Sequence, residues 1–342
     1  EDMIPNEEVV ITVSHEGYVK RTALTEYRTQ GRGGVGSKGA TTKQDDWTEY
    51  LFTASTHNYL LIFTDKGKLF WLKTYAIPEG SKTSKGRPIQ NLINIESDDK
   101  IRSIIQVESL DDQDYLNNHF LVMVTKQGVI KKTTLEQYSR PRSNGIIALN
   151  FREDDQLVNV SMTNGNQHIV IAAKSGRAIH FHESAVRPMG RTATGVKAIT
   201  LNDDKDFVIG MVCASEENAT LLVVSEKGYG KRSDLDEYRI TNRGGKGVNA
   251  MNVTDKTGAL VAIKEVVDTD DLMIINKSGI TIRISMDELR VMGRATQGVR
   301  LIRVGEGDEI SSVEKISRDE EEIIAKGEST DENSEPSQEI TE

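Results

Sequence analysis

Glycine and basic residues crowd together in residues 29–39, which read TQGRGGVGSKG. Backbone this rich in glycine adopts positive φ easily and can come close to a ligand, often a phosphate group. Gly31, Gly33 and Gly36 satisfy the pattern G-x-G-x-x-G. A dinucleotide-binding loop also needs a helix whose N-terminus holds the pyrophosphate. The next residues, SKGATTKQDDW, lack the apolar period of a helix, so the pattern does not favour a nucleotide site.

A P-loop is disfavoured for a related reason. Gly31 and Gly36 have its spacing, but Ser37 and Lys38 reverse the required Lys-Ser/Thr order. A nucleic acid backbone is the other source of phosphate, and the organisation of the whole chain bears on it.

Charge is distributed unevenly along the 342 residues. The 43 Lys and Arg against 53 Asp and Glu give a net charge of −10, which at first sight argues against nucleic acid. Residues 317–342 hold ten acids and two bases, however, so the rest of the chain is close to neutral. We expect residues 317–342 to form an acidic, disordered tail, because they are poor in large apolar residues. Such a tail either competes with a polyanion for basic surface or only aids solubility.

Composition excludes several further classes of protein. Cys213 is the only cysteine, which rules out an internal disulfide and a multi-cysteine metal site and fits a reducing cytoplasm. No run of about 20 apolar residues is present to cross a membrane. The acidic residues 1–8 do not resemble a signal peptide and are interpreted as a linker from an upstream, catalytic part of a longer protein. His180 and His182 share one strand face, but without a cysteine partner we predict no metal site.

Six internal repeats organise residues 9–316. Each has an apolar strand that ends in a turn glycine, and a second glycine follows 19 residues later in five repeats and 17 later in the third. The turn glycines are Gly17, Gly67, Gly128, Gly176, Gly228 and Gly279, and the second glycines are Gly36, Gly86, Gly145, Gly195, Gly247 and Gly298. Each repeat predicts a hairpin and two further strands, with very little helix. Four-stranded units that recur near 50 residues predict an all-β, propeller-like ring whose closure needs no capping helix.

Basic residues recur at fixed positions in these repeats. The two positions three and four past the turn glycine hold Lys20 and Arg21, Lys131 and Lys132, and Lys231 and Arg232 in the odd-numbered repeats. The even-numbered repeats have Phe70 and Trp71, Ile179 and His180, and Ile282 and Arg283. The loop around the second glycine adds Arg32, Lys38, Lys85, Arg87, Arg140, Arg142, Arg187, Arg191, Arg243, Lys246, Arg290 and Arg294.

A loop that recurs once per blade lies along one face or rim, so these bases predict a curved positive track. A polyanion on that track would bend and meet both the Lys and Arg side chains and the glycine backbone N–H groups. Aromatic residues are only 5% of the chain, which disfavours base stacking and favours duplex DNA. Ordinary solvated surface is the alternative for any single base.

The repeats closely resemble the C-terminal domain of bacterial DNA gyrase A over roughly residues 8–316. Specific segments are GYVKRTALTEYRTQGRGGVG at 17–36, GRPIQNLI at 86–93, VRPMGRTATGVKAI at 186–199, GYGKRSDLDEY at 228–238 and VMGRATQGVRLIR at 291–303. The resemblance implies a six-bladed β-pinwheel whose blades exchange strands with their neighbours. It also implies that the domain wraps duplex DNA in the positive sense, so that the gyrase holoenzyme, a type II topoisomerase, can introduce negative supercoils with ATP.

The resemblance identifies the opening stretch as the gyrase-A box, normally Gln-Arg-Arg-Gly-Gly-Lys-Gly. Gln30, Arg32, Gly33, Gly34 and Gly36 match it, whereas Gly31 and Val35 replace two basic residues. We expect the whole box and Lys38 to contact DNA, more weakly than an intact box would.

By the same resemblance the chain is non-catalytic and has no cofactor of its own, since ATP and Mg²⁺ act elsewhere in the holoenzyme. Its partners would be duplex DNA, gyrase B and the rest of gyrase A in an A2B2 heterotetramer. The isolated domain would be monomeric, in the bacterial cytoplasm and associated with the nucleoid. Two alternatives stay open, the equivalent domain of topoisomerase IV and a propeller-like scaffold for protein interactions.

Overall fold

A computed structural model describes residues 3–23, 46, 48–81, 83–214, 219–278, 280–294 and 296–317. The predicted box at residues 30–36, Lys38 and residues 318–342 of the predicted tail lie outside these residues, whereas Ser317, predicted to begin the tail, ends the last strand. Among them the fold is all-β with one short α-helix, as predicted, and no helix is long and apolar enough to cross a membrane.

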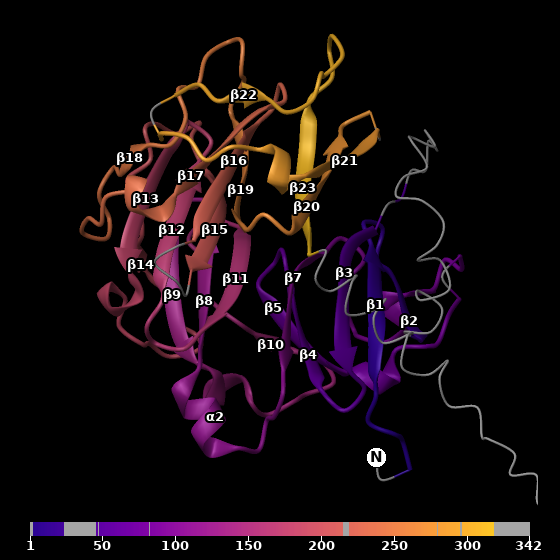
Figure 1. The fold of residues 1–342 in the computed structure, drawn as a ribbon. Coiled ribbons are helices and arrows are strands. Elements are labelled where there is room, and N and C mark those ends of the chain that lie inside the picture. The colour runs from indigo at the N-terminus through magenta and orange to yellow at the C-terminus, as the bar shows by residue number, and fades with distance from the viewer. Residues whose placement is uncertain are drawn as a thin grey trace, which may run out of the picture.

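The strands form six antiparallel sheets that follow one another around a common centre, from the indigo sheet at the right of Figure 1 to the yellow sheet above it. Strands are given from the inner to the outer edge of each blade. The first blade consists of β3 (Thr48–Ser55), β1 (Glu8–Ser14), β2 (Tyr18–Ala23) and β6 (Arg87–Pro88). The second consists of β7 (Ile101–Val107), β4 (Tyr59–Thr64), β5 (Lys68–Lys73) and β10 (Ile146–Ile147). The third blade consists of β11 (Leu157–Thr163), β8 (Phe120–Thr125), β9 (Val129–Thr134) and β14 (Val196–Lys197). The fourth consists of β15 (Val208–Ala214), β12 (His168–Ala173), β13 (Arg177–His182) and β18 (Val248–Asn249).

The fifth blade is β19 (Leu260–Val266), β16 (Thr220–Ser225), β17 (Tyr229–Asp234), β22 (Val299–Arg300). The sixth has three strands among the described residues, β23 (Ile310–Ser317), β20 (Asp270–Asn276) and β21 (Thr281–Ser285). In each of the first five blades the outermost strand comes from the next repeat, which is the strand exchange that the resemblance implied. The inner strands of neighbouring blades touch around the ring, and β23 reaches β3.

Packing between blades explains why the main strands are apolar on both faces. Strand β4 buries five of its six residues, because each side of the sheet faces a neighbouring blade. Five hydrophobic clusters each span one pair of consecutive blades, from the first and second to the fifth and sixth. Within the described part of the chain, no such cluster joins the sixth blade to the first.

Each described junction where a strand crosses to the previous blade contains two glycines, the turn glycine of one repeat and the second glycine of the next. The turn glycine adopts positive φ, and its carbonyl accepts the donated segment, as Gly176 O does from Ala250 N at 2.7 Å. The second glycine also has positive φ and lies against the backbone of the receiving strand. A Cβ on Gly247 would lie 2.2 Å from the carbonyl oxygen of Ala178, and one on Gly195 would lie 2.4 Å from that of Ile130. Strand exchange thus requires the two registered glycines.

A short 3₁₀ turn follows the second strand of most repeats. These turns are η1 (Thr74–Ala76), η3 (Leu135–Tyr138), η4 (Glu183–Ala185), η5 (Leu235–Glu237) and η6 (Met286–Glu288), and η2 (Ile89–Asn91) follows β6. The longest repeat spacing is explained by helix α2 (Gln113–Asn118), inserted between β7 and β8, where the Asp112 carboxylate caps the backbone N–H groups of Asp114 and Tyr115.

Candidate nucleic-acid interface

The residues three past the turn glycine in the odd-numbered repeats are buried lysines. Lys20 Nζ donates to the carbonyl oxygens of Ser81 at 3.0 Å and Ser84 at 2.8 Å, and Lys231 Nζ donates to that of Thr296 at 2.7 Å. Each ammonium group therefore holds the loop that precedes the second glycine of the next repeat.

Lys131 is the most enclosed of these lysines. Its Nζ contacts the carbonyl oxygens of Ala148 and Arg191 and the hydroxyl of Tyr138, the last at 3.2 Å. Burial, with a smaller contribution from the Arg191 charge, lowers the pKa of Lys131 to about 7. The pKa of Lys231 is lowered to about 8 by burial and by Arg294.

The next position, four past the turn glycine, donates a hydrogen bond at every described junction. The acceptor is always a backbone carbonyl in or directly after the 3₁₀ turn of the next repeat. The pairs are Arg21 Nε to Ile77 O at 2.9 Å, Trp71 Nε1 to Tyr138 O at 2.8 Å, Lys132 Nζ to Glu183 O at 3.1 Å, His180 Nδ1 to Tyr238 O at 2.6 Å and Arg232 Nη1 to Met286 O at 3.4 Å. Five residues of four types thus serve one structural role, and the sequence did not reveal it because their side chains differ so much.

Five of the sequence-predicted DNA contacts are therefore not surface residues in this structure. Lys20, Lys131, Lys132, Lys231 and Arg232 are between 0% and 7% exposed. Arg21 is half-buried and Lys132 also pairs with the fully buried Glu183 at 3.3 Å. The reason is the strand exchange, which brings backbone carbonyl groups of the next repeat against each blade, where these side chains donate to them.

Arginines four before the second glycine link successive loops along the outer edge. Arg191, Arg243 and Arg294 donate to the carbonyl oxygens of Ile147, Lys197 and Asn249, each on the outermost strand contributed by the preceding repeat. Arg243 Nε also donates to Ala185 O at 3.0 Å, and Arg294 Nε donates to Glu237 O at 2.9 Å. All three arginines are half-buried, so they link the loops and keep positive charge near the surface of the edge.

The remaining sequence-predicted bases among the described residues are exposed. They are Lys85, Arg87, Arg140, Arg142, Arg187, Lys246 and Arg290. Lys85 Nζ lies 4.1 Å from the ring centroid of Tyr18, and Arg140 pairs with Glu136 at 2.7 Å. The box residues Gln30, Gly31, Arg32, Gly33, Gly34, Val35, Gly36 and Lys38 lie outside the described part of the chain.

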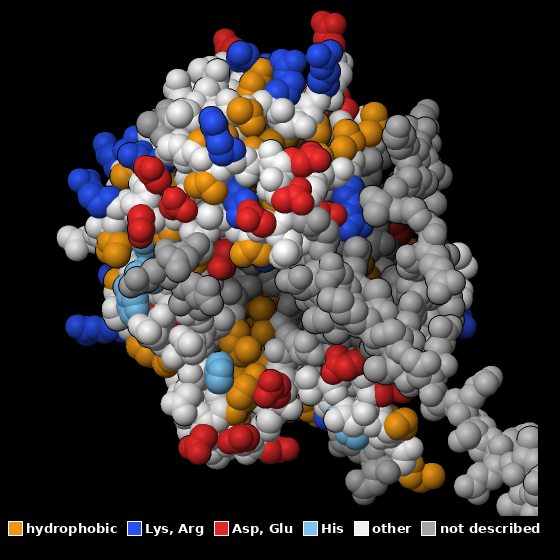
Figure 2. Space-filling model, viewed as in Figure 1, with side chains coloured by type: hydrophobic (Ala, Val, Ile, Leu, Met, Phe, Trp, Pro, Cys, Tyr) orange, Lys and Arg blue, Asp and Glu red, His pale blue; other side chains and the backbone are white. Residues whose placement is uncertain are grey.

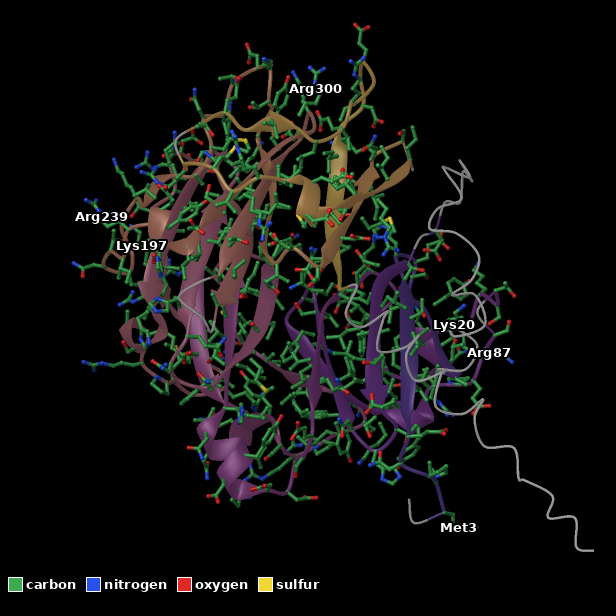
Figure 3. All side chains as sticks on the ribbon, in the orientation of Figure 1. Met3, Lys20, Arg87, Lys197, Arg239 and Arg300 are labelled. Carbon is green, nitrogen blue, oxygen red and sulfur yellow. The ribbon has the colours of Figure 1, made fainter. Side chains whose placement is uncertain are left out.

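Sequence reasoning missed three exposed bases at the same edge, Lys197, Arg239 and Arg300. Lys197 and Arg300 lie on the two-residue outer strands β14 and β22, two positions past the second glycine, which is the signal that was available. Arg300 Nη2 donates to the Tyr229 hydroxyl at 2.9 Å. Figure 3 places Arg87 at the right of the molecule, Lys197 and Arg239 at its left and Arg300 at its top.

The exposed bases form a surface that we call the basic rim, defined by Lys85, Arg87, Arg140, Arg142, Arg187, Lys197, Arg239, Lys246, Arg290 and Arg300. In Figure 2, Lys and Arg side chains gather along the left and upper edges, with some acidic side chains at the top, and other acidic side chains lie on the face toward the viewer and at the bottom. The described His, Cys, Asp and Glu side chains contain no group of three or more arranged to hold a metal ion.

Known proteins resemble this chain in sequence and in fold. It is 44% identical to the DNA gyrase A protein of Staphylococcus epidermidis over 322 residues, which covers 94% of this chain and 36% of that protein. The Staphylococcus aureus MRSA252 protein is also 44% identical, over all of this chain and 38% of its own length. The chain thus spans little more than a third of these relatives.

Two solved structures share the fold. A C-terminal domain of DNA topoisomerase IV superposes with a TM-score of 0.80 at 25% identity, covering 96% of this chain and 99% of that one. A DNA gyrase A C-terminal domain superposes with a TM-score of 0.70 at 24% identity, covering 91% of this chain and 100% of that one.

The model of the DNA gyrase C-terminal domain, β-propeller family matches six times, at residues 8–55, 58–108, 119–164, 167–215, 219–266 and 270–317. Each match contains the three long strands of one blade, so the repeats found in the sequence are the repeats of that family. Together with its relatives, this shows that the chain belongs to the family of DNA gyrase A C-terminal β-propeller domains.

Proposed function

We propose that this chain binds duplex DNA along the basic rim and bends it around the disc with positive handedness. The observation that carries the proposal is the exposure of bases from successive blades at one outer edge. A duplex that follows a curved edge meets these charges in turn, and each neutralised phosphate releases a counterion. Such contacts carry little sequence information, so preference among sequences would come from how easily the DNA bends.

The proposed contacts are the basic rim, the three arginines Arg191, Arg243 and Arg294 beside it, and the box residues 30–38. The buried Lys20, Lys131, Lys132, Lys231 and Arg232 are assigned instead to holding the loops that display these contacts. Gly31 and Val35 stand where the family has bases, so we expect the box to bind DNA less tightly than a complete box would.

The wider role follows from the relatives. We infer that the chain acts within an A2B2 gyrase, beside gyrase B and the rest of gyrase A, in the bacterial cytoplasm at the nucleoid. Wrapped DNA would be presented to a cleavage gate elsewhere in that assembly, where ATP and Mg²⁺ are used. This chain would need no cofactor and, by itself, would be monomeric.

A topology assay tests the proposal. Closed circular DNA is relaxed by a nicking-closing enzyme in the presence of the chain, with and without residues 317–342, and the linking number is read after the protein is removed. A positive shift supports chiral wrapping. If the shift appears or grows only when residues 317–342 are removed, the acidic segment competes with DNA.

The second candidate is the equivalent domain of topoisomerase IV, which the TM-score of 0.80 to such a structure favours. That interpretation predicts DNA binding and bending without a change in linking number. A protein-interaction scaffold predicts no duplex binding with or without residues 317–342. Binding of DNA that weakens steeply with salt would exclude the scaffold.

A further inference from the structure

An apolar residue follows an arginine at the same position of three consecutive repeats, the fourth, fifth and sixth. These Arg–apolar pairs lie eight and seven positions before the second glycine, and they are Arg187–Pro188, Arg239–Ile240 and Arg290–Val291. Both members of every pair are exposed, with Ile240 at 58% and Val291 at 38%. In Figure 2, hydrophobic side chains lie among the Lys and Arg side chains of the left and upper edges.

The backbone fixes where these apolar side chains stand. The residue after each one donates its N–H to the carbonyl of the residue four past the turn glycine of the preceding repeat. The bonds are Met189 N to Lys132 O at 2.8 Å, Thr241 N to His180 O at 2.9 Å and Met292 N to Arg232 O at 2.7 Å. The side chains of the same three acceptor residues bond to carbonyl groups shortly before the pair. Each apolar residue is therefore held between two bonds of its junction and stays exposed.

The second and third repeats differ at this position. In the second repeat an acid, Glu79, stands where the apolar residue would be. The third repeat has a loop two residues shorter, with Arg140 followed by Pro141, and Arg140 pairs with Glu136 at 2.7 Å. Among the described repeats, the registered pair thus belongs to the fourth, fifth and sixth and marks one stretch of the outer edge.

Exposed aliphatic residues in register at a charged edge indicate contact with a partner. Single exposed apolar residues are common, but a repeated series on a binding surface is not expected by chance. Charge alone does not account for the series, because Asp236 and Glu237 closely precede Arg239 and make the local charge mixed. When a duplex wraps around a protein, its minor groove faces inward at intervals and admits arginine side chains there. An apolar side chain beside such an arginine would meet the deoxyribose rings that form the groove wall.

We propose that the apolar residue of each Arg–apolar pair packs in the minor groove of the bound duplex, beside its arginine, and supplies a salt-independent part of the DNA affinity. The inference rests on the proposed function, because the ligand is the DNA held on the basic rim. A phosphate contact releases a counterion and steepens the salt dependence, whereas an apolar contact releases none. The two kinds of contact can therefore be measured separately.

The test is the salt dependence of duplex DNA binding by the full chain. The double variant Ile240→Ser, Val291→Ser removes apolar surface but no charge. Its affinity should fall about tenfold at every salt concentration, while the slope of log K against log salt stays that of the wild type. Val291→Ser alone should lose about threefold by the same reasoning. Val267→Ser is the matched control, because Val267 is 51% exposed but lies in the turn between β19 and β20, away from the outer strand.

A second measurement locates the contact in the minor groove. Inosine in place of guanine removes the amino group from the minor groove and leaves the major-groove edge unchanged. The wild type should bind a duplex with inosine more tightly than the same duplex with guanine, and the double variant should lose most of that preference.

Four results would overturn the groove contact while leaving the proposed function intact. They are wild-type affinity in the double variant, a flattened slope in that variant, an equal loss in Val267→Ser, and equal binding of the two duplexes by the wild type. Absence of duplex binding by the wild type at any salt concentration would overturn the proposed function together with the groove contact.

Discussion

The indole Nε1 of Trp71 on β5 donates to the carbonyl oxygen of Tyr138 at 2.8 Å, although 67 residues separate them. Tyr138 ends the 3₁₀ turn of the third repeat, and Trp71 belongs to the second. The bond therefore links the second repeat to the third, shortly before the third repeat contributes strand β10 to the second blade. Arg21, Lys132, His180 and Arg232 make the equivalent bond at the other described junctions.

Trp71→Phe should destabilise the fold by about 1–2 kcal/mol, since the Tyr138 carbonyl loses its donor while most of the aromatic packing is kept. Chemical denaturation measures the change. DNA affinity at fixed salt should stay within a factor of about two, because Trp71 carries no charge toward the rim. A large loss of affinity in a variant that is still folded would contradict the structural role given to this position.

Gly247→Ala should destabilise the fold by about 3 kcal/mol or more, because φ is +73° and the new Cβ would lie 2.2 Å from Ala178 O. Thermal melting monitored by circular dichroism gives the comparison. Gly190→Ala is the matched control, since a Cβ there meets nothing within 4 Å. Equal melting temperatures for the two variants would show that the donated strand does not need glycine at this position.

The sequence predicted the repeats well because the positions of both registered glycines need positive φ, which glycine adopts most easily. The roles of the basic residues were harder to predict. Lys131 and Lys246 look alike in the sequence, yet one is enclosed by carbonyl groups and the other is exposed. One acceptor of Lys131, the carbonyl of Arg191, lies 60 residues away in the next repeat, so no local pattern marks the lysine as buried. Strand β14 is only two residues long, too short for a period, so Lys197 at the outer edge was missed.

Lys131 should make stability depend on pH in an unusual direction. Its folded pKa is lowered to about 7 from an ordinary value near 10.5, so between these pH values the unfolded chain binds more protons than the folded chain. Stability therefore rises as the pH increases from about 7 toward 10. Lys131→Met lacks this titration, so the wild type should gain stability relative to the variant between about pH 7 and about pH 9.5.

Denaturant unfolding of both proteins at the two pH values checks this prediction. The comparison removes the contributions of other titrating groups, which the two proteins share. A stability difference between wild type and Lys131→Met that does not change with pH would mean that the ammonium, held by Tyr138 and the carbonyl groups of Ala148 and Arg191, keeps an ordinary pKa.

Removing charge from the basic rim should reduce the salt dependence of DNA binding in proportion to the phosphates lost. Arg87, Lys197 and Arg300 lie on the outer strands of three different blades, and all three are exposed. Replacing the three with alanine should flatten the slope of log K against log salt by about 2.7, at about 0.9 per phosphate contact. Each single variant should account for about a third of the change, because the sites are far apart and act independently.

The control is Lys66→Ala, since Lys66 is also exposed but pairs with Asp98 at 2.7 Å and Glu96 at 3.0 Å in the hairpin turn of the second blade. Its ammonium is already neutralised by two carboxylates, so its removal should leave the slope unchanged. If Lys66→Ala flattened the slope as much as Lys197→Ala, general attraction to the protein's charge would explain the binding. A change confined to the three outer-strand residues, in contrast, would place the duplex along the edge that strand exchange creates.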